Sequence, residues 1–372
     1  MKTPLNGLKV LDFSTLLPGP FATLYLADLG AEVIHIESPT RPDLVRIMPP
    51  YANGQATAHS YLNRNKQSIT LDLKDPASIE LIRSRITEFD IVIEQFRPEV
   101  MKRLGLDYAT LAELNPRLIY CSITGYGQTG THKDRAGHDI NYLALSGVAG
   151  HSGRLKDGPP ALGIQIADVA GGSLHAVIGI LAAVLERTQS GTGQYIDISM
   201  TDCAASLNAM SAAASLAADV KQRPETEILN GGSFYDYYQT QDDRYISIGS
   251  LEPQFMQGLA MVLELPILLE KGASFDQEDR QMVKTALKEK IKTKTWQQWQ
   301  EIFAELDVCV EPVLYLEEAL NSPLAKDRQW IVEIPLSQGS DQTQRQLACP
   351  IKFSRSILRY DFVGQALGNG NW

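Results

Sequence analysis

The chain has 372 residues, of which 44% are hydrophobic and 21% are charged, and this balance excludes disordered and fibrous proteins. Acidic residues outnumber basic ones by 44 to 34, so the net charge is −10 and nucleic acid is not an expected partner. Four widely separated cysteines form no C-x-x-C pair, which is typical of reduced thiols. The N-terminal residues MKTPLNGLKV lack the apolar region of a secretory signal, so we expect a cytoplasmic protein.

The opening of the chain predicts a strand, a helix and a second strand. Residues 8–14 form a short apolar run, residues 21–30 have helical periodicity, and residues 32–38 are again strand-like. This order predicts a parallel sheet. The turn before the helix reads LLPGP and lacks the G-x-G-x-x-G pattern through which a backbone approaches a pyrophosphate. NAD and FAD are therefore not expected ligands.

Strands and helices continue to alternate as far as residue 219, where an alanine-rich helix is expected to end. The segment 128–170 is rich in glycine, proline and charged residues, which predicts loops with one short helix. The apolar run 174–185 is too short to span a bilayer, so no membrane contact is expected. The remaining predicted elements are strands 68–74, 90–96, 118–127 and 195–200, and helices 76–89, 101–116 and 173–193.

A change of composition after residue 220 predicts a second, smaller domain. Its expected elements are a linker at 221–227, a hairpin at 234–249 with Asp242 and Asp243 in the turn, and helices at 252–264 and 277–305. The closing residues QLACPIKFSRS are interpreted as a returning edge strand. We therefore expect an α/β large domain at 1–220, a small α+β domain at 225–310, and a C-terminal segment at 311–372 that returns to the large domain.

His138 lies in the segment AGHDINYLALSG, where a short helix is expected to begin. On that helix Ile140, Leu143 and Ala144 would share the buried side. A histidine can take and give a proton near neutral pH, which makes His138 a candidate acid or base. The residues alone leave a second interpretation open, a surface or core histidine beside Asp139 as a helix-start acid.

Asp168 precedes two glycines and the long helix that is expected from residue 173. One interpretation is a helix cap, because the free N–H groups of a helix start stabilise a carboxylate. The other is a base or a covalent nucleophile, because the glycines let backbone N–H groups approach a ligand oxygen. Both interpretations remain open from the spacing.

Glu252 follows a predicted strand and precedes Pro253, so in isolation it is typical of a solvated acid at a helix start. Several basic residues are expected near the ends of sheet elements. There they either attract phosphate groups or are ordinary solvated side chains. They are Arg64, Lys66, Lys74, Arg97, Lys102 and Arg103.

A set of motifs resembles the family III CoA-transferase superfamily, which includes the carnitine dehydratase and bile-acid-inducible proteins. These motifs are the opening GLKVLDFSTLLPGPFATLYLADLGAEVIHIESP, NRNK at 63–66, LDLK at 71–74, FRPEVMKRLGL at 96–106 and SITGYGQTG at 122–130. The resemblance extends from about residue 5 to about residue 354. Within the superfamily, GHDINY at 137–142 and EPQF at 252–255 resemble the α-methylacyl-CoA racemase branch.

The resemblance implies roles for individual residues. The histidine of GHDINY and the aspartate of the helix-start loop form the acid/base pair of that branch, here His138 and Asp168, with Glu252 and Asp139 as supporting partners. The implied contacts to CoA are Leu71, Asp72, Leu73, Lys74, Gln95, Phe96, Arg97 and Arg103, and the backbone of Gly137, Ile140, Asn141 and Tyr142. No metal and no separate cofactor are implied, because CoA is part of the substrate.

One feature of the racemases is missing from this chain. They often carry an arginine before the proline that ends the second strand, whereas this chain has Ser38 before Pro39. Arg41 and Arg46 are the candidate substitutes. The absence affects the expected contact to the adenosine phosphate and not the proton chemistry.

The implied fold is a Rossmann-like large domain with a small domain, in a homodimer whose two chains interlock. In that assembly the active site lies where the large domain of one subunit meets the small domain of the other. Glu252 would then approach His138 from the partner subunit.

The implied activity is inversion of the α-carbon of a 2-methylacyl-CoA thioester through an enolate, with His138 and Asp168 on opposite faces. The alternative is CoA transfer between a thioester and a carboxylate, with Asp168 as nucleophile. The transferases generally lack GHDINY and tend to have a longer glycine run than Gly231-Gly232, so the racemase is favoured. A third hypothesis, an acyl-CoA-binding protein without catalysis, is disfavoured because all four implied catalytic-site residues are present.

Overall fold

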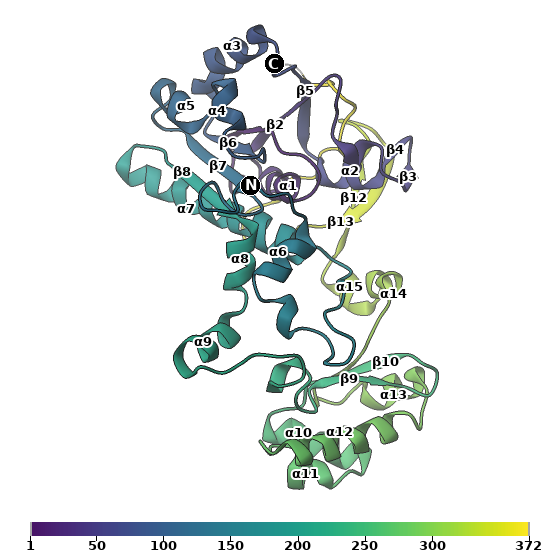
Figure 1. Cartoon of the computed structure of the whole chain (residues 1–372). Coiled ribbons are helices and arrows are strands. Elements are labelled where there is room, and N and C mark those ends of the chain that lie inside the picture. The colour runs from purple at the N-terminus through teal and green to yellow at the C-terminus, as the bar shows by residue number, and fades with distance from the viewer. Residues whose placement is uncertain (1, 371–372) are drawn as a thin grey trace. The chain divides into compact units, whose positions relative to one another are not determined.

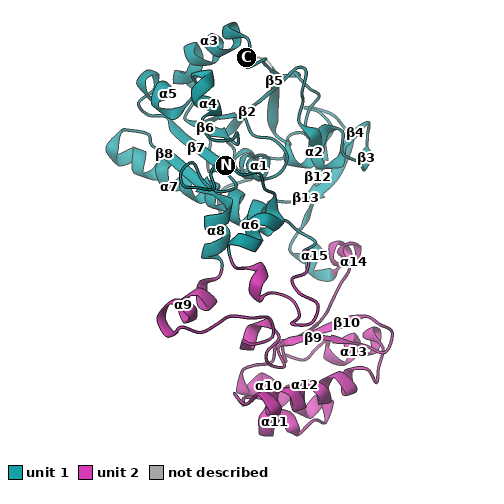
Figure 2. Cartoon of the chain, viewed as in Figure 1, with its two compact units in different colours: residues 1–146, 162–207, 323–372 teal, residues 147–161, 208–322 magenta. Residues whose placement is uncertain are grey.

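A six-stranded parallel sheet forms the centre of the larger of two units in the computed structural model of the chain (Figures 1 and 2). The structure describes residues 2–370, so residues 1, 371 and 372 of the expected segments lie outside it. Unit 1 consists of Met1–Ser146, Leu162–Leu207 and Pro323–Trp372. Unit 2 consists of Gly147–Ala161 and Asn208–Ser322.

The strand order of the central sheet is β5-β2-β1-β6-β7-β8, and every neighbouring pair is parallel. The sequence order reverses between β1 and β6, so the loops that leave their carboxyl ends diverge and open a crevice. The expected parallel α/β sheet is confirmed. The strands are β1 (Lys9–Asp12), β2 (Glu32–Glu37), β5 (Lys66–Thr70), β6 (Ile91–Glu94), β7 (Ile119–Thr124) and β8 (Tyr195–Ser199).

Helices of unit 1 connect and cover these strands. Their bounds are α1 (Pro18–Asp28), α2 (Thr57–Leu62), α3 (Pro76–Arg85), α4 (Val100–Leu104), α5 (Tyr108–Leu114), α6 (Asp139–Leu145), α7 (Leu174–Ser190), α8 (Met200–Ser206) and α15 (Pro323–Asp327). The single helix expected at 101–116 is two helices, because Gly105 has a φ of +69° and ends α4. The alanine-rich helix is also divided, into α8 and, in unit 2, α9 (Ala209–Ala218).

One helix is longer than the sequence predicted. Residues Ala167–Ser190 form a continuous helix of 24 residues, π-helical from Ala167 to Ser173 (labelled η4) and α-helical after that. This helix is long and apolar enough to cross a membrane by length and composition only, a test that the core helix of a soluble protein also passes. It packs against α1, β7 and β8, as a helix that covers a sheet does.

Apolar side chains on one face of the sheet form a buried core with α3, α5 and the short helix η2 (Ile86–Glu88). Leu11, Val92 and Tyr120 of the sheet pack there with Ile82 and Leu111. Burial of an aliphatic side chain of this size stabilises the fold by roughly 1.5–3 kcal/mol. The core therefore fixes the strands whose carboxyl ends carry the loops discussed below.

The smaller sheets of unit 1 lie outside the central sheet. Strands β12 (Ile331–Pro335) and β13 (Thr343–Leu347) pair with each other in an antiparallel ribbon. The interpretation of QLACPIKFSRS as an edge strand was wrong, because only its first two residues belong to β13 and the rest is irregular. Strands β3 (Tyr51–Ala52) and β4 (Gln55–Ala56) form a second short hairpin, which follows the 3₁₀ turn η1 (Leu44–Arg46).

Unit 2 has a three-stranded antiparallel sheet of order β11-β10-β9, packed with helices around Phe234, Tyr238 and Trp299. The expected hairpin is confirmed, with Asp243 in its turn. The strands are β9 (Asp236–Gln239), β10 (Tyr245–Ile248) and β11 (Val310–Pro312). The helices after α9 are α10 (Pro253–Leu263), α11 (Ile267–Lys271), α12 (Gln277–Ile291), α13 (Trp296–Phe303) and α14 (Leu316–Asn321), with 3₁₀ turns η3 (Ala149–His151) and η5 (Ile228–Asn230).

The bounds of unit 2 differ from the small domain expected at 225–310. The segment Gly147–Ala161 belongs to unit 2, where Arg154 pairs with Asp236. The unit also extends beyond residue 310, because β11 pairs with β10. Neither contact is visible in the sequence pattern, since each joins segments that lie more than sixty residues apart.

Candidate active site

A cavity of about 460 Å³ lies in unit 1 beyond the carboxyl ends of β1, β6 and β7, at the crevice where the strand order reverses. Ligands of open α/β sheets bind at this position. The structure brings eight of the predicted site residues to this one cavity. They are Gln95, Phe96, Arg97, Gly137, His138, Asn141, Tyr142 and Asp168.

His138 is the residue that immediately precedes α6, so the helix begins where the sequence predicted. The backbone N–H of His138 donates to Oδ1 of Asn141 at 3.0 Å, which fixes the entry to the helix. The His138 side chain is exposed to the cavity and is not a buried core histidine. An exposed imidazole at a cavity wall can exchange protons with a bound ligand.

The buried side of α6 agrees only in part with the expected one, at Leu143. Tyr142 and Leu143 are buried, whereas Ile140 is 60% exposed and Ala144 is exposed. The reason is the position of Tyr142, whose hydroxyl donates to the carbonyl of Gly137 at 2.6 Å and whose ring meets Tyr126 edge-on at 5.3 Å. This packing turns the helix so that Tyr142 faces inward.

Gly137 is required by the same packing. A Cβ atom at this position would lie 2.7 Å from both the Tyr126 hydroxyl and the Tyr142 ring. Any larger residue would push the tyrosines apart and displace the start of α6. The glycine before His138 therefore sets the position of the histidine.

Asp139 and Asp168 are joined through a backbone contact. Oδ1 of Asp139 accepts the N–H groups of Ala167, at 2.6 Å, and of Asp168, at 3.1 Å. Asp139 therefore caps the helix that carries Asp168. The interpretation of Asp168 as the cap was wrong, because Asp168 lies within the first turn of η4 and its side chain faces the cavity. The residue next to His138 thus fixes the position of Asp168.

The surroundings of Asp168 favour its neutral form. Burial and, to a smaller extent, the charge of Asp139 raise the pKa of Asp168 to about 6, against the opposing effect of His138. No cation is paired with this carboxyl among the described contacts. A carboxyl group poised near neutrality serves both as proton donor and as proton acceptor.

Three basic residues line the cavity with the acid/base candidates. Arg97 was predicted, whereas Lys133 and Arg135 were missed. The sequence feature that could have identified them is the presence of two basic residues shortly before GHDINY, in a segment without apolar periodicity. Together the three side chains offer positive charge to an anionic ligand in an otherwise acidic protein.

The floor of the cavity comes from the loop after β1, which sequence analysis did not assign to the site. Leu16 has a φ of 62°, a rare conformation for a leucine, and its N–H donates to both carboxyl oxygens of buried Asp43 at 3.0 and 3.1 Å. The N–H of Gly19 donates to Oε1 of Gln95 at 2.9 Å, which ties the loops after β1 and β6 together. The other wall residues are Leu17, Pro18, Pro98, Ile123, Thr124, Gly125, Ala136 and Met200.

Other predicted CoA contacts do not line this cavity. Leu71 and Leu73 pack against the apolar core of the sheet, and Asp72, Lys74 and Arg103 are exposed elsewhere on unit 1. Ile140 and Asp139 also lie outside the lining. The role of these residues in binding CoA stays a prediction.

Arg46 is not available as a substitute for the arginine missing at Ser38. Its guanidinium Nε donates to Glu37 at 2.8 Å and its Nη1 to the carbonyl of Gln365 at 3.0 Å. Burial alone would favour neutral Glu37, but hydrogen bonds led by that from Arg46 lower the pKa of Glu37 to about 2. Arg41 is exposed and stays a candidate.

Arg64 and Lys66 are structural and not phosphate ligands. Arg64 is buried against Asp28, with Nε 2.9 Å from Oδ1. Lys66 is buried too, and its Nζ donates to the carbonyl of Pro20 at 2.9 Å and lies 3.7 Å from Asp12. Buried cations with such partners are held by the fold.

Glu252 lies in unit 2, at the residue before α10, with Pro253 in the first helical turn as predicted. Its side chain is exposed and lines no described cavity of unit 1. The structure thus gives the local setting of Glu252 and says nothing of a partner for it in unit 1.

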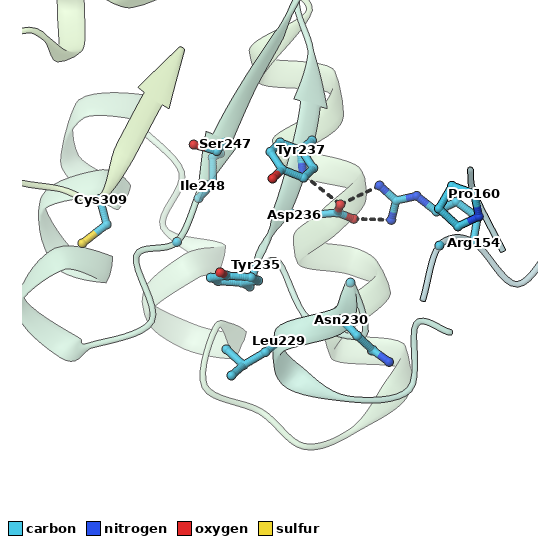
Figure 3. Close-up of a pocket in the computed structure, with 13 residues that line it drawn as sticks. Arg154, Pro160, Leu229, Asn230, Tyr235, Asp236, Tyr237, Ser247, Ile248 and Cys309 are labelled. Atoms are coloured by element: carbon cyan, nitrogen blue, oxygen red, sulfur yellow. Dashed lines mark hydrogen bonds and ion pairs between the residues drawn. The ribbon is translucent and has the colours of Figure 1, made fainter. Parts of the chain in front are cut away.

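A second cavity, of about 530 Å³, lies in unit 2 and was not predicted (Figure 3). Its prominent feature is an ion-pair cluster in which the two terminal nitrogens of Arg154 bond Asp236 at 2.6 and 2.7 Å. Lys284 also lies 2.9 Å from Asp236. Burial opposes the charge, but Arg154 and Lys284 together lower the pKa of Asp236. This carboxylate is saturated with partners and poorly suited to proton transfer.

No group of three or more His, Cys, Asp or Glu side chains among residues 2–370 is arranged to hold a metal ion.

Comparison with known proteins finds similarity along most of the chain. A model of CoA-transferase family III matches residues 5–366. The chain is 37% identical to α-methylacyl-CoA racemase of Mus musculus over 330 residues, which cover 87% of this chain and 81% of that one. It is 33% identical to acetyl-CoA:oxalate CoA-transferase of Acetobacter aceti, covering 97% of this chain and 96% of that one. The crystal structure of a CAIB/BAIF family protein from Brucella suis superposes with a TM-score of 0.85 at 30% identity, covering 99% and 97% of the two chains.

Proposed function

The chain belongs to CoA-transferase family III, and on that premise we propose that it inverts the α-carbon of 2-methylacyl-CoA thioesters. The observation that carries this proposal is the presence of His138 and Asp168 in one cavity, at the crevice where the strand order of the sheet reverses. The identity to the mouse racemase supports the same conclusion.

Inversion needs two proton-exchanging groups on opposite faces of the substrate. The thioester carbonyl acidifies the α-hydrogen, because the carbanion left by its removal is delocalised as an enolate. One group takes the α-proton, the other returns a proton to the opposite face, and the α-carbon is inverted with no net change in atoms or charge. We assign these roles to His138 and Asp168, and they exchange between the two directions of the reaction.

The raised pKa of Asp168 supports this assignment. A carboxyl of ordinary acidity would hold a proton too weakly to return it to an enolate near neutral pH, whereas one with a pKa of about 6 can both give and take it. Asp139 contributes twice, because it holds the helix start through Ala167 and its charge raises the pKa of Asp168.

The charge of the cavity wall suits a CoA thioester. CoA carries phosphate groups, and Arg97, Lys133 and Arg135 are the basic residues of the wall. We therefore propose that these three side chains face the anionic part of the substrate, while the thioester carbon lies between His138 and Asp168.

We further propose that two chains form the interlocked homodimer that the resemblance to this family implies. In that homodimer, Glu252 of the partner subunit would complete the site beside His138. Exposed apolar side chains on α9, among them Leu216 at 88% and Met210 at 74% exposure, support a large contact with a second chain. Co-expression of His138→Ala and Glu252→Ala chains tests the shared site, because a hybrid dimer regains one intact site. If purified hybrids stay inactive, the partner does not supply Glu252.

The proposed activity is tested by exchange of the α-hydrogen. The protein is incubated in D₂O with one epimer of a 2-methylacyl-CoA, and the α-position is followed by NMR. We expect deuterium to enter with inversion and without a carboxylate acceptor. His138→Ala should slow the exchange by about 10²–10⁴-fold, since that is the usual contribution of a positioned acid or base.

CoA transfer is the second candidate, because a CoA-transferase relative matches nearly the whole length of both chains. In that reaction the Asp168 carboxylate attacks the thioester carbonyl, the C–S bond breaks and CoA thiolate leaves, giving a mixed anhydride. CoA thiolate then attacks the aspartyl carbonyl, which releases the first carboxylate and leaves an aspartyl-CoA thioester. The acceptor carboxylate takes up CoA by the same two steps in reverse, which frees the Asp168 carboxylate. An unchanged α-hydrogen together with transfer of CoA to an added carboxylate would establish this alternative.

A further inference from the structure

Glu94 is a buried carboxyl that the proposed mechanism does not use. It ends β6 and is 3% exposed. Its Oε2 accepts the N–H of Phe96 at 2.8 Å, and its carboxyl group is hydrogen-bonded to the side chain of Ser122 on the neighbouring strand β7. The Ser122 hydroxyl oxygen in turn accepts the hydroxyl of Tyr195 on β8 at 3.0 Å. A chain of hydrogen bonds thus crosses three strands and ends at the backbone of Phe96.

The backbone held in this way belongs to the catalytic cavity. Gln95, Phe96 and Arg97 all line the cavity that contains His138 and Asp168. Glu94 itself lines a separate cavity of about 270 Å³, which also contains Arg97 and lies on the side of α4 and α5. Arg97 therefore borders both cavities, and Glu94 holds the segment Gln95–Arg97 through the backbone N–H of Phe96.

We propose that Glu94 is a positioning residue for acyl-CoA, whose negative charge holds the segment Gln95–Arg97 in the conformation that binds CoA. This inference rests on the proposed function of the same site. When Glu94 takes up a proton, one of its oxygens becomes a hydroxyl group and the carboxyl loses its charge, so the hydrogen bonds from Ser122 and from Phe96 are weakened. CoA affinity then falls although no residue that touches CoA has changed.

The surroundings of Glu94 place this change in an accessible pH range. Burial, with a smaller effect of the charge of Asp197, raises the pKa of Glu94 to about 7, although the hydrogen bonds from Ser122 and Phe96 oppose this rise. Titratable and charged groups that line this cavity or act electrostatically with Glu94 come from α4, the start of α5, β7, β8 and the loop after β6. They are Arg97, Glu99, Lys102, Asp107, Tyr108, Tyr120, Cys121, Tyr195 and Asp197.

Cations near Glu94 do not neutralise it in the structure. Lys102 pairs with Glu99 at 3.5 Å on the exposed rim of the cavity, and the described contacts of Glu94 are to Phe96 and Ser122 alone. Glu99 lines the same cavity but is exposed and makes no described bond to the segment Gln95–Arg97. It therefore offers a control of equal charge.

The test is a calorimetric titration of the full-length protein with free CoA between about pH 6 and pH 8. The wild type, Glu94→Gln and Glu99→Gln are compared, so that protonation of the CoA phosphates contributes equally to all three. We expect the wild-type affinity to fall by roughly three- to ten-fold from pH 8 to pH 6 relative to Glu94→Gln, as the loss of one buried hydrogen bond predicts. At pH 8, Glu94→Gln should bind CoA more weakly than the wild type, whereas Glu99→Gln should follow the wild type.

A purely structural Glu94 gives a different pattern. Glu94→Gln would then change the unfolding temperature while its CoA affinity kept the pH profile of the wild type, and that result overturns the inference. The same profile in Glu99→Gln as in Glu94→Gln also overturns it, because a general charge effect would explain both. A wild-type protein that fails to bind CoA at any pH contradicts the proposed function instead. Kinetics distinguish a positioning role from a catalytic one, since substitution of a positioning residue raises KM for the thioester and leaves kcat nearly unchanged.

Discussion

Two partly buried aspartates, one in each unit, have opposite surroundings. Asp168 in unit 1 lies in a cavity beside the like charge of Asp139, and burial raises its pKa to about 6. Asp236 in unit 2 also lies in a cavity, but Arg154 and Lys284 bond it and, against burial, lower its pKa. The same type of side chain thus has a raised pKa in one unit and a lowered pKa in the other.

The difference gives a criterion for separating a candidate catalytic carboxyl from a structural one. Both cavities are of similar volume, so volume alone does not identify the active site. What differs is whether the charge of the carboxylate is already satisfied. An unpaired, desolvated carboxyl is poised for proton transfer, whereas a paired one stabilises the fold.

Asp168→Asn is expected to have the largest effect on activity. Loss of one of the two proton-exchanging groups should slow α-hydrogen exchange by about 10²–10⁴-fold. Above about pH 6 the free energy of unfolding of the variant should be higher than that of the wild type. The reason is that a carboxyl with a raised pKa destabilises the folded state once it ionises, and asparagine does not ionise. Exchange in D₂O and urea unfolding at about pH 7.5 measure the two effects. Wild-type exchange by this variant would remove Asp168 from the mechanism.

Asp236→Asn is the matched substitution in unit 2, and it should affect stability. Lys284, which is nearly buried, would lose its anionic partner, and the expected cost is about 3–5 kcal/mol of unfolding free energy at neutral pH. Because the pKa of Asp236 is lowered in the fold, its contribution is present above its ordinary value of 3.8 and is lost as pH falls below that value. Urea unfolding at neutral and acidic pH measures both. A stable variant would show that the ion-pair cluster does not hold the unit.

Asp139 allows the electrostatic and capping contributions at Asp168 to be separated. Asp139→Asn keeps an oxygen for the N–H groups of Ala167 and Asp168 but removes the charge, so the acid limb of the exchange rate should move to lower pH. Asp139→Ala loses the cap as well and should cost a further ~1 kcal/mol of unfolding free energy. Equal pH profiles in wild type and Asp139→Asn would contradict the electrostatic role.

Glu225 should have the smallest effect. It lies 3.3 Å from Arg154 at the half-exposed rim of the unit 2 cluster, where solvent screens the interaction. Glu225→Gln is expected to change the unfolding free energy by no more than about 1 kcal/mol. A cost as large as that of Asp236→Asn would mean that the cluster acts as one cooperative network. Urea unfolding of the single and double variants distinguishes the two cases.

Much of unit 1 could be predicted because its elements are local patterns. The βαβ opening, the strands and the start of α6 at His138 follow from apolar periodicity and from turn residues. The prediction of a single helix at 101–116 was wrong. The apolar pattern continues across Gly105, but the positive φ of this residue divides the segment into two helices. In α6, periodicity indicated Ile140 as buried, but the contact between Tyr142 and Tyr126 sets the rotation of the helix.

The candidate site could be predicted in residue type but not in arrangement. The pair of His138 and Asp168 came from motifs, and the structure brings them to one cavity. The hydrogen bond between the N–H of Ala167 and the carboxylate of Asp139 joins residues 28 positions apart, and no local sequence pattern indicates such a contact. The Arg154–Asp236 pair was missed for the same reason, since it spans 82 residues and fixes a unit boundary.

The pH dependence of α-hydrogen exchange tests the central claim, that the cavity poises Asp168 near neutrality. Exchange in either direction requires one proton on the pair formed by His138 and Asp168, so both directions should share one acid limb. We predict that kcat/KM falls as pH drops through about 6, where Asp168 takes up a proton. An acid limb near the ordinary aspartate value of 3.8, with full exchange at pH 5, would contradict the account.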